Sequence, residues 1–326
     1  MTLADTRSIP NPPFQRIGTG FYYALAAANK GATVVMLNRA SERATSAAVS
    51  LRERCTGTGT FDDSITCDLM SFKSVRRAAE AVLSKYSTGI DVLCNNAGIM
   101  AFPDAATEDG FDTQMQTNHL SHFLLTTLLF SLLEKAADVK GEARIVNHSS
   151  IARHGHGTLK EQYFGPNGGN LGGDGSSMFC GGARWVRYGM TKLANSVFTY
   201  MLDKKLKAKG SKVKAVVAAP GLSHTNLQLE TEKRGGMASG CGGNMWIMSM
   251  AQSSGDGAMG ILHASFKECE GGLFYEPKNG FSGLPVLVKP KAYETDVTSS
   301  EMMWAASEKA VGATFLTEGG AAVATV

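Results

Sequence analysis

A tyrosine and a lysine stand four residues apart, at Tyr188 and Lys192, in a stretch whose apolar spacing predicts a helix. Residues at i and i+4 lie on one face of a helix, one turn apart, so the phenol and the ammonium would be neighbours. A cation beside a tyrosine favours the phenolate and lowers its pKa from about 10 toward neutral pH. Such a phenol can donate or accept a proton in carbonyl chemistry. The pair alone is a weak signal, because the same spacing arises by chance on helix surfaces.

Other polar groups stand directly after predicted strands. Ligands of an open parallel sheet bind beyond the carboxyl ends of its strands, so these groups are expected around one crevice. They are Asn95-Asn96-Ala97-Gly98, Ser149-Ser150 and Pro220-Gly221 with Thr225, together with Asn118 inside a long predicted helix.

The elements that must position these residues follow from the alternation of short apolar runs with helical patterns. This alternation predicts βαβ units with right-handed crossovers. We therefore expect an α/β fold, with a doubly wound, Rossmann-like parallel sheet in three αβα layers. Strands are expected at 33–37, 64–67, 90–94, 144–148 and 212–219, and helices at 21–30, 71–86, 111–137, 185–207 and 300–310. The chain after residue 270 is otherwise expected to be irregular.

The motifs, in this order, resemble the short-chain dehydrogenase/reductase family. FDTQMQTNHLSHFLLTTLL at 111–129 and YGMTKLAN at 188–195 look most like its retinol-dehydrogenase-like branch, which includes the WW-domain oxidoreductases. The resemblance implies a carbonyl reductase or alcohol dehydrogenase that transfers a hydride between a nicotinamide and a carbonyl or alcohol carbon. Four residues match the family's catalytic positions. Tyr188 matches the general acid/base, Lys192 the residue that tunes it and holds the nicotinamide ribose, Ser150 the residue that bonds the substrate oxygen, and Asn118 the residue that seats a proton-relay water.

The resemblance also implies a set of cofactor contacts. Asp68 matches the residue that bonds the adenine amine, and Asn38-Arg39 ends the strand where an acidic residue usually bonds the ribose 2′-hydroxyl of NAD. Arginine there suits a 2′-phosphate, so we expect NADP(H) rather than NAD(H). The full expected set is Gly18, Gly20, Asn38, Arg39, Asp68, Asn95, Ala97, Gly98, Tyr188, Lys192, Pro220, Gly221 and Thr225.

The N-terminus departs from the family's pattern of a strand followed by T-G-x-x-x-G-x-G. PFQRIGTG at 13–20 keeps Gly18 and Gly20 but has Phe14 in place of the first glycine. SIPNPP before it is unlike a strand, because proline does not fit a central strand. We expect the first strand to be missing and its neighbours to keep unpaired backbone groups. Three interpretations follow: a truncated or mis-spliced gene product, which we favour, a loop that binds cofactor imperfectly, and a catalytically inactive relative that no longer binds dinucleotide.

The composition of the chain argues against some kinds of binding partner and favours others. The 326 residues carry 32 basic and 29 acidic side chains, a balance that argues against a nucleic-acid surface. The six cysteines are widely spaced without a C-x-x-C pair, so no metal site is expected. The apolar stretch MWIMSM at 245–250 suits a lipophilic substrate that is retinoid-, steroid- or fatty-aldehyde-like.

We see no signal peptide and no apolar run of transmembrane length, which favours a cytoplasmic location. A homodimer is expected from the family alone. We expect one domain over 1–326, with an irregular N-terminus at 1–13, a glycine-rich insertion at 153–184 and a substrate-loop region at 222–250.

Overall fold

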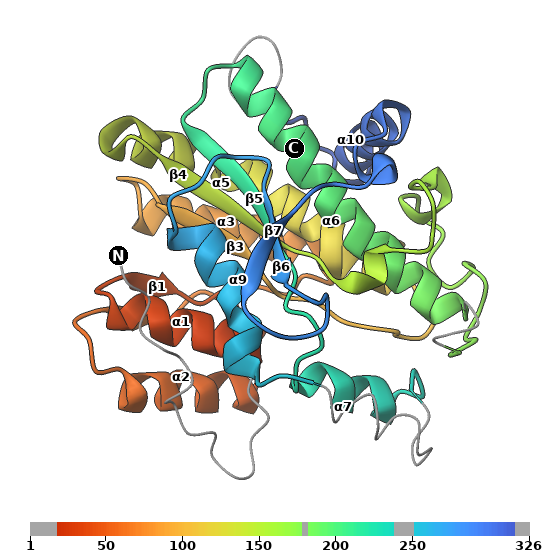
Figure 1. The fold of residues 1–326 in the computed structure, drawn as a ribbon, viewed down its shortest axis with the longest axis horizontal. Helices are drawn as coiled ribbons and strands as arrows, with labels where there is room; N and C mark the ends of the chain where they lie inside the picture. The colour runs from red at the N-terminus through yellow and green to blue at the C-terminus, as the bar shows by residue number, and fades with distance from the viewer. Residues whose placement is uncertain (1–17, 178–181, 238–250, 317–326) are drawn as a thin grey trace.

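Helices cover both faces of a mostly parallel sheet in the computed structural model, which describes residues 18–177, 182–237 and 251–316 (Figure 1). One apolar core lies between the sheet and α3 (Phe72–Lys85), α5 (Ser121–Lys140) and α6 (Ala183–Ala208). A second core lies on the other face, against α1 (Thr19–Asn29) and α9 (Ser254–Phe266). The predicted Rossmann-like αβα arrangement is therefore confirmed.

The strands fall into two separate sheets. A small sheet pairs β1 (Thr33–Val35) with β2 (Thr60–Asp62) in parallel. The larger sheet has the order β3 (Val92–Asn95), β4 (Ala143–His148), β5 (Val213–Ala218), β6 (Phe274–Pro277) and β7 (Pro285–Val288). All its pairs are parallel except β6 with β7.

Within the described ranges no strand joins the two sheets, so a gap lies between β1 and β3 in this part of the chain. SIPNPP and Phe14, where the first strand was expected to be missing, lie outside the described residues. Val34 of β1 and Val92 and Cys94 of β3 are only half-buried, although helices cover both faces. In contrast, all six residues of β4 are buried. Because each parallel strand pairs on one side only, β1 and β3 both present an unpaired edge to this gap.

The remaining helices begin and end at recognisable signals. Ser41 caps α2 (Glu42–Arg54) by accepting a hydrogen bond from Ala44 N, and Gly141, at φ +89°, ends α5.

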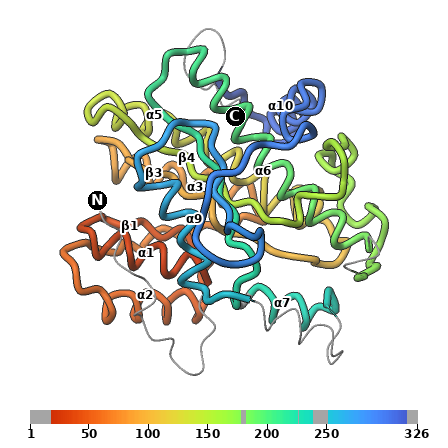
Figure 2. The backbone as a smooth tube through the Cα atoms, in the orientation of Figure 1, coloured from red at the N-terminus to blue at the C-terminus, as the bar shows by residue number. Residues whose placement is uncertain are grey.

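The other elements of the described chain are α4 (Thr113–Met115), the π-helical turn η2 (Gln116–Leu120), the 3₁₀ turns η3 (Ile151–Arg153), η4 (Glu161–Tyr163) and η5 (Ala292–Glu294), and the helices α7 (Asn226–Lys233) and α10 (Val297–Val311). The backbone trace places β1, α1 and α2 at one end of the molecule, away from α10 (Figure 2).

Two sequence predictions about these elements were wrong. The strand expected at 64–67 lies instead at 60–62, and Thr66 makes only an isolated bridge with Asn38. The chain after residue 270 forms β6 and β7 rather than irregular structure, because a four-residue antiparallel pair gives little periodicity to detect. The sequence patterns also did not predict the helices α2, α7 and α9. The stretch SGDGAMGILHASF forms α9, with Ala258, Ile261 and Leu262 buried, although its glycines disfavour a helix.

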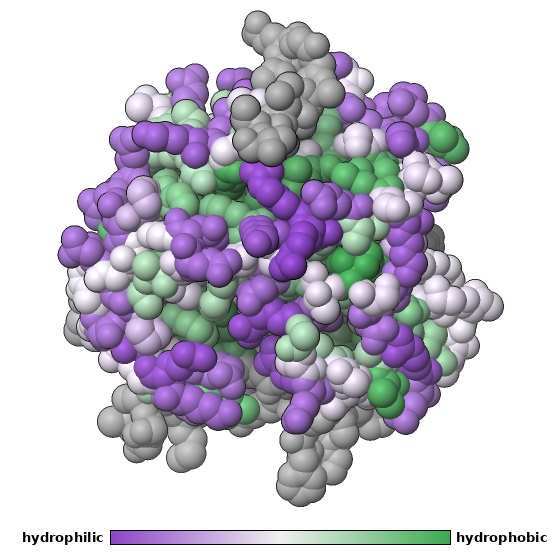
Figure 3. Space-filling view, turned by 180° about the vertical axis from the view of Figure 1, so that it is seen from behind, coloured by the Kyte–Doolittle hydropathy of each residue, from purple (hydrophilic) through white to green (hydrophobic). Residues whose placement is uncertain are grey.

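The continuous helical segment Thr113–Lys140 is long and apolar enough to span a membrane by length and composition alone. Its most apolar window is 78% buried inside the protein. Phe123, Leu124 and Leu133 are fully enclosed, which accounts for its apolar composition as the central helix of one layer. Seen from behind, the surface carries mostly hydrophilic side chains with hydrophobic patches between them (Figure 3).

The described part of the glycine-rich insertion at 153–184 is docked onto the body. Arg187 of α6, only 1% exposed, donates hydrogen bonds to the carbonyl oxygens of Leu171 at 3.0 Å and Gly173 at 2.8 Å. Asp104 accepts from the backbone N–H groups of the same two residues at 2.7 and 2.9 Å. These bonds fix the insertion against the helix that carries Tyr188. Residues 178–181 of the insertion lie outside the described part.

Candidate active site

A cavity of about 1960 Å³ opens at the carboxyl ends of β3, β4 and β5 and continues into the gap beside β1. The proposed cofactor residues all line it, as do Tyr188, Lys192 and Ser150. Asn118 is the one predicted site residue that does not. The doubly wound sheet thus gathers side chains that are up to about two hundred positions apart in sequence.

Tyr188 and Lys192 lie in the middle of α6 and are both almost fully buried, at 4% and 5% exposure. The Lys192 ammonium lies 5.8 Å from the centre of the Tyr188 ring and donates to the carbonyl oxygen of His148 at 3.1 Å. Tyr188 also hydrogen-bonds the side chain of Ser150. The three side chains therefore form one polar group at the wall of the cavity.

The expected lowering of the Tyr188 pKa is wrong for this structure. Burial raises the pKa of Tyr188 to about 12, and the hydrogen bond with Ser150 offsets this only in part. Burial also lowers the pKa of Lys192, to about 8. The spacing correctly predicted that the two side chains are neighbours, but burial determines the direction of the pKa shift of each group.

Ser150 sits at the end of β4, where the chain turns into η3. Its hydroxyl accepts a hydrogen bond from Ala152 N at 3.2 Å and so caps the 3₁₀ turn. Arg153 donates to the Ser150 carbonyl oxygen at 3.2 Å. The preceding serine, Ser149, is buried and bonds Lys192 O and Ser196 Oγ, which is a structural role.

Asn118 is fully buried in the π-helical turn η2 and does not line the cavity, although its neighbour Thr117 does. Its amide group bonds both backbone groups of Ile99, at 2.8 and 2.9 Å, and Thr191 Oγ1 at 2.9 Å. Its carbonyl oxygen accepts from His122 Nδ1 at 3.1 Å. π-helical turns are frequent at functional sites. Here the turn holds the strand-end segment that carries Gly98.

Glycine is required at two places where backbone borders the cavity. A Cβ at Gly98 would lie 3.0 Å from Asn118 Oδ1 and 3.5 Å from Lys192 Nζ. Gly221 has φ +65°, and a Cβ there would lie 2.3 Å from the carbonyl oxygen of Phe281. Because glycine has no Cβ, the backbone can pack closely against its neighbours at both positions beside the site. Beyond Gly221, Thr225 caps α7 and bonds Gln228 Oε1 at 2.7 Å.

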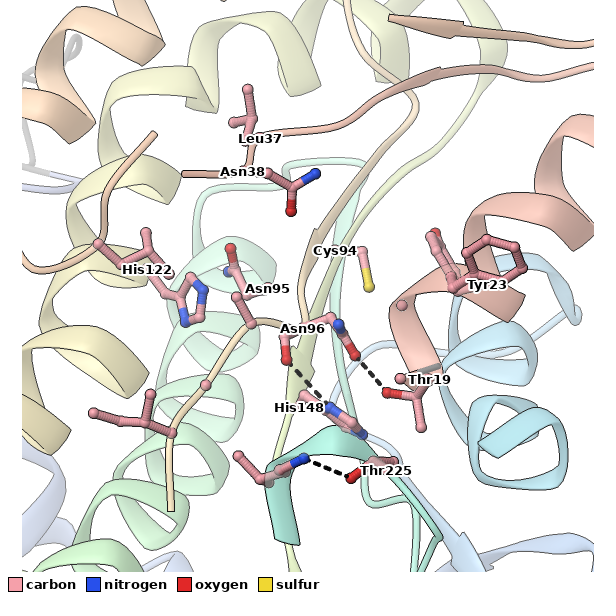
Figure 4. A pocket seen from close by; sticks show the side chains of 18 of the residues that line it. Thr19, Tyr23, Leu37, Asn38, Cys94, Asn95, Asn96, His122, His148 and Thr225 are labelled. Carbon is pink, nitrogen blue, oxygen red and sulfur yellow. Dashed lines mark hydrogen bonds between the residues drawn. The ribbon is translucent and has the colours of Figure 1, made fainter. Parts of the chain in front are cut away.

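The two asparagines after β3 have different surroundings. Asn95 turns into the core, where its amide donates to Thr126 Oγ1 at 3.0 Å and Asn147 Oδ1 at 2.8 Å. Asn96 faces the cavity and accepts a hydrogen bond from Thr19 Oγ1 at 3.1 Å (Figure 4). This bond joins the end of β3 to the first turn of α1, which Gly18 and Gly20 also border.

The far end of the cavity carries Asn38, Arg39 and Asp68. Arg39 is exposed and, within the ranges described, makes no ion pair, so its guanidinium is available to an anion. Asp68 is half-buried, and its Oδ1 accepts from Met70 N at 2.9 Å. A cation and a carboxylate at this end are compatible with a phosphate and an amine of one ligand.

Three residues that shape the site were not predicted from the sequence: Thr19, His148 and Arg153. Thr19 adjoins the glycines already singled out, and His148 is the middle residue of VNHSS. Position in those motifs could have identified both. Nothing in the sequence marks Arg153, because its partners Glu276 and Glu294 are more than a hundred residues away. His119 is fully buried, and its ring nitrogens hydrogen-bond the side chains of Asn195 and Ser307.

Comparison with known proteins gives consistent similarities. The model of the short chain dehydrogenase family matches residues 16–164. A short-chain dehydrogenase/reductase of Penicillium roqueforti is 32% identical over 253 residues, covering 74% of this chain and 68% of the relative. Retinol dehydrogenase 13 of Homo sapiens is 32% identical over 218 residues, covering 66% of this chain and 58% of the relative.

Solved structures share the fold. A crystal structure of a protein from Mycobacterium Paratuberculosis superposes with a TM-score of 0.69 at 30% identity, over 96% of this chain and 99% of the other. L-sorbose reductase from Gluconobacter frateurii, solved with NADPH and L-sorbose, gives a TM-score of 0.57 at 20% identity, over 82% and 92%. The second likeness concerns the fold alone.

Proposed function

Because the chain belongs to the short-chain dehydrogenase/reductase family, in its retinol-dehydrogenase-like branch, we propose that it is an NADP(H)-dependent oxidoreductase of lipophilic carbonyl or alcohol compounds. The observation that carries this proposal is the buried group of Tyr188, Lys192 and Ser150 on the wall of a cavity large enough for a dinucleotide and a substrate. A nicotinamide cofactor, when bound, supplies or receives the hydride.

The residues around the cavity fit such a cofactor. Gly98 and Gly221 let the chain pack closely against Asn118 and Phe281 at the cavity wall, and Lys192, which lines the cavity, offers an ammonium for ribose hydroxyls. The first turn of α1 directs backbone N–H groups to the cavity, next to the Thr19 and Asn96 pair, which suits a pyrophosphate. Arg39 at the far end supports NADP(H) over NAD(H), because a guanidinium matches a 2′-phosphate.

Proton transfer falls to the Tyr188 hydroxyl. In the direction of reduction it would donate its proton to the substrate oxygen while the carbonyl carbon receives a hydride, so that an alcohol forms. In the direction of oxidation it would accept the alcohol proton. Ser150, which bonds Tyr188, would hold the same substrate oxygen by a hydrogen bond. The positive charge of Lys192 would favour the phenolate when Tyr188 has given up its proton.

A lipophilic substrate is supported by the side chains around Tyr188. Met100 and Trp185 pack against its ring, and Leu227 and Met237 extend the same apolar cluster. All four line the cavity. The 245–250 stretch that first pointed to such a substrate lies outside the described residues. The homodimer and the cytoplasmic location remain predictions.

The test is consumption of NADPH with a panel of long-chain and cyclic aldehydes and ketones. Tyr188→Phe should lower turnover by roughly 10² to 10⁴-fold while NADPH affinity stays near that of the wild type. The matched control is Tyr200→Phe on the same helix, outside the cavity, which should retain turnover. Full turnover in Tyr188→Phe would refute the assigned role. A folded wild type with neither turnover nor NADPH binding would instead favour an inactive relative, which the gap beside β1 also allows.

A further inference from the structure

His148, the last residue of β4, carries an imidazole nitrogen that nothing in the mechanism above uses. The side chain is 7% exposed and lines the cavity. Its Nε2 is buried and has no hydrogen-bond partner among the described residues. A buried polar atom without a partner costs free energy, so its persistence at a binding cavity points to a ligand group.

The tautomer of His148 follows from its other nitrogen. Nδ1 lies 3.5 Å from the carbonyl oxygen of Asn96, which can only accept a hydrogen bond. Nδ1 therefore carries the proton, and Nε2 presents a lone pair. Burial, with Lys192 and His122 nearby, lowers the pKa of His148 to about 3, so the ring is neutral. Nε2 is thus a neutral acceptor.

The backbone of His148 is fixed by the catalytic helix. Its carbonyl oxygen accepts hydrogen bonds from Lys192 Nζ at 3.1 Å and Asn195 Nδ2 at 3.0 Å. The imidazole lies among Asn96, Thr19 and Thr225, with its second nitrogen turned toward the Thr19 side of the cavity (Figure 4). His148 therefore lies between Lys192, which is assigned to the nicotinamide ribose, and the Thr19 and Asn96 pair, which is assigned to the pyrophosphate.

We propose that His148 Nε2 accepts a hydrogen bond from a donor on the nicotinamide half of the bound dinucleotide. This inference rests on the proposed function. Phosphate and carboxylate groups are excluded as partners, because at neutral pH they offer only acceptors. The donors on that half are the ribose hydroxyls and the carboxamide NH₂, which share the required chemistry. His148 is thus a cofactor-positioning residue that determines where the nicotinamide ring lies relative to Tyr188.

The test is calorimetric titration of NADP⁺ into the wild type and His148→Val. Valine suits a buried strand and removes the acceptor, and leaving the cofactor donor unpaired should weaken binding roughly tenfold. The matched control is His263→Val on α9. His263 is half-buried and lies outside the cavity, and its buried Nδ1 also has no hydrogen-bond partner among the described residues. This control should bind NADP⁺ as the wild type does.

The 3-acetylpyridine analogue of NADP⁺, which replaces the carboxamide NH₂ by a methyl group, separates the two donors. If the carboxamide is the donor, the wild type should bind the analogue about tenfold more weakly than it binds NADP⁺. The His148→Val variant should then bind the analogue and NADP⁺ equally well. If a ribose hydroxyl is the donor, His148→Val should weaken NADP⁺ and the analogue equally. Equal NADP⁺ affinity of His148→Val and the wild type would overturn the inference alone. A folded wild type that does not bind NADP⁺ would overturn the proposed function with it.

Discussion

Replacing Arg153 by methionine should destabilise the fold strongly, because this arginine holds the segment after Ser150 to the C-terminal part of the chain. Its guanidinium bonds Glu294 at 3.0 Å and Glu276 at 2.8 Å and lies 4.1 Å from the centre of the Phe274 ring. Arg153 is 2% exposed and the Glu294 side chain is 0% exposed. Methionine keeps much of the apolar packing but leaves two carboxylates near one another without their cation.

Removing one partner of a buried ion pair costs about 3–5 kcal/mol, so Arg153→Met should lower the free energy of unfolding by about that amount. Urea unfolding followed by tryptophan fluorescence measures it. The control is Arg52→Met, because Arg52 pairs with Asp63 at 2.5 Å on the surface, with side chains 46% and 40% exposed. That variant should cost less than about 1 kcal/mol.

We also predict that a second substitution recovers part of the lost free energy of unfolding. Arg153→Met combined with Glu294→Met removes the uncompensated carboxylate, so the double variant should be more stable than the sum of the two single losses implies. An Arg153→Met protein as stable as Arg52→Met would refute the account of this cluster. Strictly additive losses would refute the explanation by an unpaired charge.

Three further predictions concern the site. Arg39→Asp should weaken NADPH binding by about tenfold or more and strengthen NADH binding, and titrations that leave the NADPH/NADH ratio unchanged would contradict the assignment of Arg39. The value of kcat/KM for reduction should fall as pH rises through about 8, because Lys192 is cationic below its pKa and neutral above it; a profile flat from pH 7 to 9 would contradict this. Gly221→Ala should cost more stability than Gly210→Ala, since both have φ +65° but only Gly221 lacks space for a Cβ; equal losses in thermal unfolding would contradict the close approach to Phe281.

Sequence patterns predicted the sheet and the catalytic helix well because both depend on local periodicity and on motifs at strand ends. The 26-residue helix α6, with Tyr188 and Lys192 on one face, is one example. The absence of a first strand stays a prediction, because SIPNPP, which does not suit a central strand, lies outside the described residues. The strands β6 and β7 were not predicted, because each has only four residues and too little periodicity to recognise. The turn at 278–284 brings the two strands together as an antiparallel pair.

The electrostatics of the site could not be predicted from the sequence. The i, i+4 spacing indicates that Tyr188 and Lys192 are neighbours, but their pKa values depend on burial, which raises one and lowers the other. The unpartnered nitrogen of His148 depends on three-dimensional packing in the same way. The Arg153 network joins residues 123 and 141 positions apart, and no spacing rule connects them.

Titration of NADPH into the wild-type chain, followed by the fluorescence of the reduced nicotinamide, tests the central claim most directly. We predict saturable binding of one dinucleotide per chain, although Phe14 replaces the first glycine of the motif, because the ends of β3, β4 and β5 and the helix α6 contribute much of the cavity wall. A sample that unfolds cooperatively on heating but shows no saturable NADPH binding would contradict it.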